Sequence, residues 1–507
     1  MNSINIAIRV DASSQIGTGH FMRNLTLANE LSKRGAKVRF VSRHVPEYLQ
    51  DMLFDKGYEL RLIDSPANET KIDELPHSIW LGTSQHEDAQ NTSLALSDRI
   101  WDWLVVDHYA LDARWESQLR KTVKQILVID DIADRLHDCD ILLDQNYYID
   151  MDTRYTGKVP PKCRLLLGPH YALLRDEFRE WRQHIKPRSG LVKRILVFFG
   201  GVDADNYTGR AIDALAGLGI NGLHVDVVIG AQHPYREEIE LACKEHSFNC
   251  YVQIDLMAEL MANADLAIGA GGSATWERCC LGLPTFVMCT ADNQKQQVVD
   301  AASEGLLYAP EINDDFKNWI KLHVCALIDN ISLRQLIYNN SLKAVDGSGV
   351  LRVIRNFGCH GINIRFATHE DSEKLFEWRN HQTVRTVSRN IEVISWEDHQ
   401  QWFEKVLSST DKHLLIGYRN GLPVGVVRFD SKDDEAEVSI YLVPGTKASG
   451  LGADLLQSAE QWFSTCYPEI RKILACVLGG NVRSNHLFLG AGYQVESTSY
   501  IKELARL

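Results

Sequence analysis

The sequence predicts an α/β protein with two lobes built on parallel sheets, followed by a smaller α+β domain. From residue 4 onward, apolar runs alternate with longer amphipathic stretches, the alternation restarts at residue 194, and its character changes after residue 361. Such alternation of strands and helices is typical of doubly wound parallel sheets. The length of 507 residues also exceeds one compact domain, since domains usually hold about 100 to 200 residues.

The two lobes are predicted over residues 1–175 and 190–345. Their clearest apolar runs are residues 4–10, 36–42, 103–109, 124–130, 194–201, 224–230, 265–271 and 284–289. The cleft between two such lobes is the usual place for a ligand.

The glycines of residues 346–361 predict a junction, and the third domain is predicted over residues 361–507. A strand at 362–368 is followed by helical segments around Trp378 and His399 and by a hairpin with its turn at residues 420–421. The mixture predicts an α+β domain of ordinary size.

Composition narrows the class of partner. The net charge of -13 argues against nucleic acid and anionic membranes, and no apolar run reaches the roughly 18 residues that a membrane helix needs. The first residues lack the pattern of a signal peptide, and the 11 cysteines include no CxxC pair. We therefore expect a cytoplasmic protein with reduced thiols and no metal, whose oligomeric state the sequence does not determine.

A glycine-rich loop carrying a histidine follows the first predicted strand. It contains Gly17, Gly19 and His20, with Arg23 at the start of the next helical stretch. Glycines let the backbone approach a ligand, and a helix start directs free N–H groups towards it. A histidine there is kept neutral by the positive helix end and can act as a base, although a histidine that only caps or packs is the alternative.

From this loop onward, residues 4–345 resemble the UDP-sugar hydrolase family of pseudaminic acid biosynthesis, itself similar to glycosyltransferases of the GT-B fold. The resemblance implies that His20 activates water for attack on the anomeric carbon, displacing UDP. It also implies that Tyr109, in residues 105–112, lies near the sugar. The alternative for residues 107–109 is an ordinary strand end. A GT-B glycosyltransferase that uses the same nucleotide loops is the alternative for this half.

The second lobe carries a nucleotide cradle. Gly200 and Gly201 close one strand, and residues 269–277 combine glycines with an acidic residue one helical turn later. The resemblance implies that Glu277 binds the ribose and that Asn293 contacts the substrate, although Glu277 also fits a solvated helix carboxylate. The expected contacts of substrate and nucleotide are Gly17, Gly19, Arg23, Gly200, Gly201, Gly271, Gly272, Ser273, Glu277, Asn293 and Gln294.

The third domain resembles the GNAT acetyltransferases. A strand at 437–444 leads into a glycine-rich loop and a helix, and residues 481–493 complete the motif. The implied acetyl-CoA contacts are Val443, Lys447, Gly450, Gly452, Ala453, Asn481, Ser484 and Phe488. Phe488 stands where the family often has a tyrosine that protonates the departing thiolate, so water or Tyr441 must replace it. Glu437 is the candidate base, and a solvent-facing strand residue is its alternative.

Residues 378–381 and 396–403 resemble the subgroup that acetylates the 4-amino group of the pseudaminic acid precursor. Together the resemblances imply two reactions on a route to a nonulosonic acid used in flagellin glycosylation. A UDP-linked 4-amino sugar is acetylated by acetyl-CoA, and the UDP-2,4-diacetamido-2,4,6-trideoxyhexose, with L-altro configuration inherited from the resemblance, is then hydrolysed. The alternatives are a GT-B glycosyltransferase whose GNAT domain serves a different amino sugar, and a regulatory protein that only binds such ligands.

Overall fold

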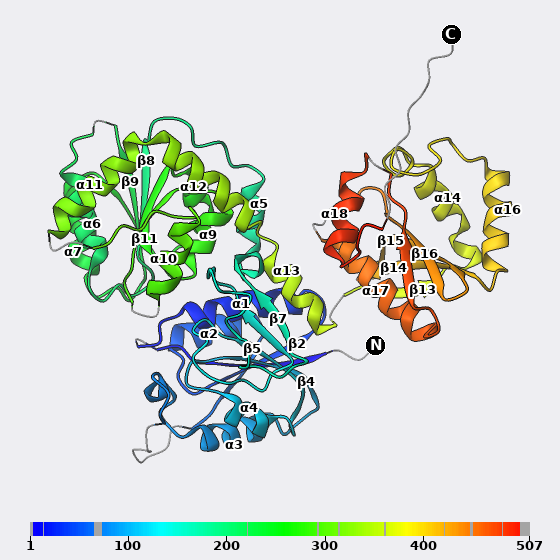
Figure 1. Cartoon of the computed structure of the whole chain (residues 1–507), viewed down its shortest axis with the longest axis horizontal. Helices are drawn as coiled ribbons and strands as arrows, with labels where there is room; N and C mark the ends of the chain where they lie inside the picture. The colour runs from blue at the N-terminus through cyan, green and yellow to red at the C-terminus, as the bar shows by residue number, and fades with distance from the viewer. Residues whose placement is uncertain are drawn as a thin grey trace, which may run out of the picture. The chain divides into compact units, whose positions relative to one another are not determined.

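The chain forms two compact units, Met1–Phe357 and Gly358–Leu507. The computed structural model describes residues 4–13, 15–64, 73–220, 222–291, 294–312, 315–358, 361–419, 421–446, 450–478 and 480–496. Figure 1 shows three sheets, two in the first unit and one in the second. Across these residues we find no helix with both the length and the apolar character needed to cross a membrane.

The first lobe is a seven-stranded parallel sheet with the order β3-β2-β1-β4-β5-β6-β7. Its strands are β1 (Asn5–Val10), β2 (Lys37–Ser42), β3 (Glu59–Leu62), β4 (Trp101–Asp107), β5 (Val123–Ile129), β6 (Ile141–Asp144) and β7 (Arg164–Leu167). Its helices are α1 (Gly19–Ser32), α2 (Glu47–Asp55), η1 (Ser78–Leu81), α3 (Gln85–Ala95), α4 (Ala113–Leu119) and η2 (Pro169–Tyr171). The strand order reverses between β1 and β4, and the crevice beyond their carboxyl ends is where such sheets bind ligands.

The second lobe repeats this plan with five parallel strands in the order β10-β9-β8-β11-β12. They are β8 (Arg194–Phe198), β9 (His224–Ile229), β10 (Asn249–Val252), β11 (Leu266–Ala270) and β12 (Thr285–Met288). The helices are α5 (Asp176–Arg182), α6 (Tyr207–Ala216), α7 (Arg236–Glu245), α8 (Met257–Asn263), α9 (Ala274–Cys280), α10 (Lys295–Ser303), α11 (Phe316–Asp329) and α12 (Ile331–Ala344). The switch point, between β8 and β11, carries the two glycine-rich loops.

The segment at 346–361, which the sequence predicts as a junction, contains the boundary between the two units and is largely helical. It forms α13 (Gly349–Ile354) and η4 (Arg355–Phe357), and α13 packs on α1 and η2 of the first lobe. A Cβ at Gly349 would lie 2.3 Å from the carbonyl oxygen of Ala172, so this glycine permits close packing and does not signal a flexible linker. The buried Val350, Val353 and Ile354 hold the helix in place.

The second unit is a mixed sheet with the order β13-β14-β15-β16-β17, antiparallel except for the parallel pair β16 and β17. Its strands are β13 (Asn363–Phe366), β14 (Lys412–Arg419), β15 (Leu422–Lys432), β16 (Glu435–Leu442) and β17 (Lys472–Ala475). Its helices are η5 (His369–Asp371), α14 (Ser372–Asn380), α15 (Gln382–Arg385), α16 (Trp396–Leu407), α17 (Leu451–Cys466) and α18 (Val482–Gly490).

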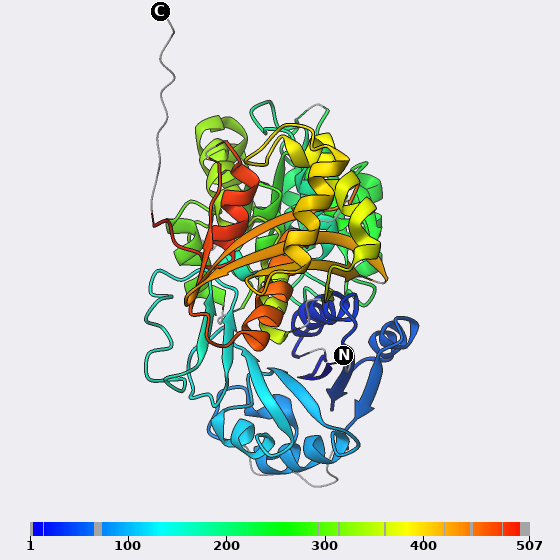
Figure 2. The same ribbon diagram turned by 90° about the vertical axis from the view of Figure 1, so that its right-hand side faces the viewer.

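Alternate residues of the strands build two cores on opposite faces of this sheet. Leu415 packs into the core under α17, whereas its neighbours Leu414 and Ile416 pack into the core under α14 and α16. Figure 2 shows the yellow helices of residues 372–407 covering one face of the orange strands. The predicted fold class, two Rossmann-like lobes followed by an α+β domain, is therefore confirmed.

Candidate active sites

His20 and Asp107 meet at the switch point of the first sheet. His20 lies in the first turn of α1, which follows β1, and Asp107 is the last residue of the adjacent β4. Their side chains are joined by a hydrogen bond of 2.6 Å between His20 Nδ1 and Asp107 Oδ1. Burial alone would raise the pKa of Asp107, but Arg23 and His20 hold it well below its usual range. An ionised carboxylate therefore orients the imidazole, whose side chain is 12% exposed.

Arg23 holds the Asp107 carboxylate of this pair in place. Its Nε and Nη2 donate to the two oxygens of Asp107 at 2.7 Å, and Nη1 donates to Asp131 Oδ2 at 2.7 Å. Asn24 Nδ2 adds a fourth bond to Asp107 at 2.5 Å. Every nitrogen of the buried guanidinium thus bonds a carboxylate, so Arg23 holds Asp107 and Asp131, and its contact with the substrate stays a prediction.

Tyr109 packs against His20 but uses its hydroxyl elsewhere. The two rings meet edge to face with centroids 4.6 Å apart, and the hydroxyl donates to Asp131 Oδ2 at 2.7 Å. Burial and the charge of Asp131 raise the pKa of Tyr109 well above its ordinary value. The hydroxyl stays protonated, and the side chain is placed to hold the imidazole in position.

The glycine-rich loops of both lobes converge near His20. A Cβ at Gly201 would lie 3.8 Å from Thr18 Oγ1, and a Cβ at Gly19 would lie 4.0 Å from Ser273 Oγ. Gly17 and Gly200 have φ of +76° and +100°, a region that favours glycine. The structure thus brings the predicted loop of the first lobe to both predicted loops of the second.

Gln294 lies beside the glycine-rich loop that contains Gly271 and Gly272. A Cβ at Gly272 would lie 3.5 Å from Gln294 Nε2, and a Cβ at Gly271 would lie 2.3 Å from Val298 Cγ2. Within the described part of the chain, the buried Gln294 Oε1 has no hydrogen-bond partner, so it can accept a bond from a ligand. The predicted contact Asn293 lies outside the described residues.

Glu277 stands in the first turn of α9, directly beyond this loop. Its side chain is 20% exposed, and Oε1 lies 3.7 Å from Arg175 Nη2. Burial raises the pKa of Glu277, and Arg175 and Arg278 oppose this rise. At that separation the carboxylate keeps acceptor capacity for further donors, such as hydroxyl groups.

The sequence analysis missed Asp107 as the partner of His20, and it missed Asp131, Asn146 and Trp276 entirely. The available signal was that acidic residues stand at the carboxyl ends of two adjacent strands: Asp107 closes β4, and Asp130 and Asp131 follow β5. Among the described residues, no group of three or more His, Cys, Asp or Glu side chains is arranged to hold a metal ion.

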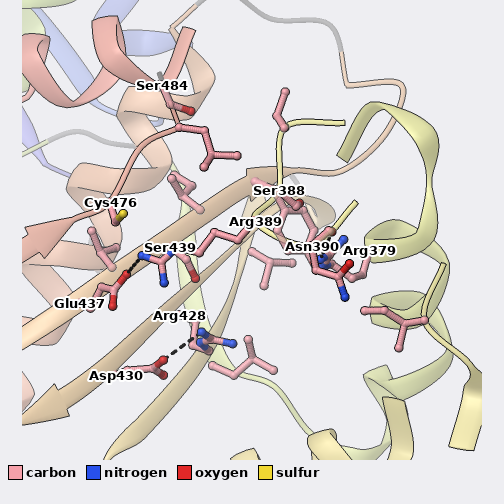
Figure 3. Close-up of a pocket in the computed structure, with 18 of the residues that line it drawn as sticks. Arg379, Ser388, Arg389, Asn390, Arg428, Asp430, Glu437, Ser439, Cys476 and Ser484 are labelled. Atoms are coloured by element: carbon pink, nitrogen blue, oxygen red, sulfur yellow. Dashed lines mark hydrogen bonds and ion pairs between the residues drawn. The ribbon is translucent and has the colours of Figure 1, made fainter. Parts of the chain in front are cut away.

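The second unit contains a cavity of about 760 Å³ where β16 and β17 separate. Their parallel pairing ends at Val438 and Ala475, although β16 continues to Leu442. The cavity lining includes the predicted Glu437, Asn481, Ser484 and Phe488. Glu437, whose side chain is 43% exposed, is ion-paired with Arg389. Figure 3 shows Glu437 on the left and Arg379 on the right of the cavity lining.

The predicted acetyl-CoA segment is built from two helix starts. Gly450, with φ of +82°, precedes α17, and its carbonyl accepts the N–H group of Ala453 at 3.1 Å. Asn481 caps α18 by accepting the N–H group of Ser484 at 3.1 Å. A Cβ at Gly452 would lie 3.9 Å from Leu487, so the first turn of α17 packs against α18.

The contacts predicted for Val443 and Lys447 stay predictions. The N–H group of Val443 bonds the carbonyl of Val424 at 3.0 Å, and Lys447 lies outside the described residues. Phe488 is buried and packs against the ring of Tyr493. Tyr441 also lines the cavity, and burial raises its pKa, so its hydroxyl stays protonated.

Comparisons with known proteins agree with this division of the chain. The model of the acetyltransferase (GNAT) domain family matches residues 362–494. The UDP-2,4-diacetamido-2,4,6-trideoxy-beta-L-altropyranose hydrolase of Campylobacter jejuni is 25% identical over 60% of this chain and 97% of its own. An uncharacterized protein of Methanocaldococcus jannaschii is 24% identical over 97% of both chains, so the two-unit arrangement recurs.

Among solved structures, the glycosyltransferase of kitacinnamycin superposes on 70% of this chain and 100% of its own, with 16% identity and a TM-score of 0.50, which supports the fold alone. The GNAT match supports acetyl-CoA as the co-substrate of the second unit. The chain thus joins a GT-B-like unit, homologous to the UDP-2,4-diacetamido-2,4,6-trideoxy-beta-L-altropyranose hydrolase, to a GNAT acetyltransferase domain.

Proposed function

We propose that the protein is a bifunctional enzyme of pseudaminic acid biosynthesis. Its GNAT domain acetylates the 4-amino group of a UDP-linked amino sugar, and its first unit hydrolyses the UDP-2,4-diacetamido-2,4,6-trideoxyhexose to free sugar and UDP. The observation that carries the hydrolysis is the buried pair of His20 and Asp107 at the loops of both lobes. We place both reactions in the cytoplasm, where acetyl-CoA and UDP-sugars are available.

In the proposed hydrolysis, His20 Nε2 takes a proton from water as the water oxygen attacks the anomeric carbon. The bond from that carbon to the diphosphate oxygen breaks, and UDP leaves with the electron pair. Asp107, bonded to Nδ1, stabilises the imidazolium that forms. In this proposal, backbone N–H groups of the loops at 200–201 and 271–273 bind the diphosphate, and Glu277 binds the ribose.

In the proposed acetyl transfer, Glu437 removes a proton from the ammonium of the acceptor, directly or through water. The amine attacks the thioester carbonyl, and the thiolate of coenzyme A departs. Tyr441 lines the same cavity and keeps its hydroxyl proton, so it is our candidate for protonating that thiolate in place of Phe488.

The other side of this cavity suits the anionic part of a UDP-linked acceptor. Arg379 Nη2 donates to the carbonyl of Asn390 at 3.0 Å, whereas its buried Nη1 has no hydrogen-bond partner among the described residues. Burial lowers the pKa of Arg379, and the nearby Arg385 and Arg428 lower it further. A diphosphate there would supply the missing acceptor and the opposite charge.

A GT-B glycosyltransferase is the second candidate for the first unit, because the fold similarity is to a glycosyltransferase. An acceptor-free assay separates the two. Purified protein is incubated with the UDP-diacetamido sugar, and UDP and free sugar are measured by mass spectrometry. Release of both in water supports the hydrolase, whereas release only after a sugar acceptor is added refutes it. A protein that binds these ligands without turnover would instead be regulatory.

A further inference from the structure

A path of buried hydrogen bonds connects the nucleotide-loop helix of the second lobe to the first lobe. Trp276 of α9 donates from Nε1 to Asn146 Oδ1 at 3.0 Å. Asn146 donates from Nδ2 to Asp131 Oδ1 at 2.9 Å. All three side chains are buried, with Asn146 following β6 and Asp131 following β5. We name Trp276, Asn146 and Asp131 the interlobe relay.

The chemistry of the relay allows only one arrangement of the amide. An indole N–H group can donate but not accept, so it must face the amide oxygen of Asn146. The amide NH₂ is then directed at Asp131, which as a carboxylate can only accept. Removing the indole N–H group would leave the amide free to turn, and Asp131 would lose its fixed donor.

The relay continues to His20 through two further residues. Asp131 Oδ2 accepts bonds of 2.7 Å from both Arg23 Nη1 and the Tyr109 hydroxyl. Arg23 Nη2 lies 3.1 Å from His20 Nδ1, and the ring of Tyr109 packs against the imidazole. The placement of Asp131 therefore determines where Arg23 and Tyr109 hold His20.

We propose that Trp276, Asn146 and Asp131 are positioning residues for the hydrolysis, and that they make the orientation of His20 depend on the placement of α9. The inference rests on the proposed function, in which His20 is the base and α9 carries the ribose ligand. Glu277 is the next residue after Trp276, so a nucleotide that binds Glu277 also fixes the start of the relay. Binding of the UDP group would thereby align the base with the sugar to be cleaved.

The competing explanation is that the bond from Trp276 to Asn146 only joins the lobes. A second interlobe bond offers a matched control, because Tyr147, next to Asn146, donates from its hydroxyl to Glu304 Oε2 at 3.1 Å. This bond also joins the two lobes, but among the residues that the structure describes neither the Tyr147 nor the Glu304 side chain bonds Asp131. A purely structural role predicts similar effects when either bond is removed.

The test compares Trp276→Phe, Asn146→Leu, the double variant and Tyr147→Phe in the full chain. For each protein, kcat and KM are measured with the UDP-diacetamido sugar, and the Kd of UDP is measured by calorimetry. We expect each relay variant to lower kcat about tenfold, the double variant also about tenfold, since both changes break one path, and Tyr147→Phe to stay within about twofold. The Kd of UDP should change by less than about threefold.

The relay would be overturned by unchanged kcat in the single variants, by multiplying losses in the double variant, or by an equal loss with Tyr147→Phe. Trp101→Phe measures the cost of the substitution itself, because its buried indole donates to the carbonyl of Leu96, outside the relay, at 2.8 Å. A loss of UDP affinity in Trp276→Phe would also count against the relay, because the substitution would then act on nucleotide binding and not on the orientation of His20. If wild-type protein releases no UDP from this substrate, the proposed function fails instead.

Discussion

Replacement of Asp107 by Asn tests whether the proposed base, His20, needs the carboxylate that is bonded to it. Asp107 accepts four hydrogen bonds, one from His20, two from Arg23 and one from Asn24. An amide keeps only one oxygen for these donors and carries no charge to stabilise an imidazolium. We expect kcat for UDP release to fall by at least about 100-fold, within the usual contribution of general base catalysis.

The same change should also weaken the fold. Breaking a buried ion pair costs about 3–5 kcal/mol, because Arg23 is left without part of its counter-charge. The pKa of Asp107 is depressed in the folded protein, so its contribution to stability is complete above its unfolded value of about 3.9 and declines as the pH falls below that. The difference in stability between wild type and Asp107→Asn should therefore be full at pH 7 and smaller at pH 3.

Asp102→Asn is the matched control, because it makes the same substitution at the other end of β4. Asp102 pairs with Lys124 at 2.8 Å, and that lysine side chain is 62% exposed, so the pair should contribute only about 0–1 kcal/mol. The assay is UDP release by the full chain, with calorimetry for UDP affinity and unfolding. Wild-type kcat in Asp107→Asn, or equal losses in both variants, would refute the role given to Asp107.

Four further predictions follow from the same sites. His20→Asn should lower UDP release by about 100- to 10,000-fold with UDP affinity nearly unchanged, and comparable turnover would remove His20 from the mechanism. Glu277→Ala should weaken UDP binding by about 1.5 to 3 kcal/mol without affecting acetyl transfer; unchanged affinity in calorimetry would return Glu277 to a solvated carboxylate. Arg379→Gln should raise the KM of the UDP-amino sugar about tenfold or more, whereas Arg385→Gln, at a residue outside the cavity lining, should leave it unchanged. The same KM in Arg379→Gln and wild type would contradict a contact between Arg379 and the anionic group. Rapid UDP release from the UDP-4-amino sugar should require acetyl-CoA, since a site that bonds the amide can reject the amine by as much as about 10,000-fold, and equal rates without acetyl-CoA would refute this order.

Local sequence patterns were sufficient to predict the strands that carry the sites. Apolar runs at 4–10 and 265–271 became β1 and β11, because a buried parallel strand leaves a continuous apolar signature. The glycine-rich loops that follow them were equally visible, since a tight turn before a helix start selects glycine within a few residues of chain. The boundary between the units falls within the predicted junction at 346–361, but α13 was not predicted, because the sequence does not distinguish a glycine needed for close packing from one at a turn.

The sequence by itself thus determined the fold class and the glycine-rich helix start that carries His20. Only the tertiary structure decided what holds that histidine. Asp107, Asp131, Asn146 and Trp276 come from three strand ends and a helix of the other lobe, far apart along the chain. Each looks ordinary in its own segment, because a hydrogen bond depends on distance and direction in space and leaves no periodic pattern in sequence. The same reason applies to Arg23, because only the fold shows that its guanidinium bonds two buried carboxylates.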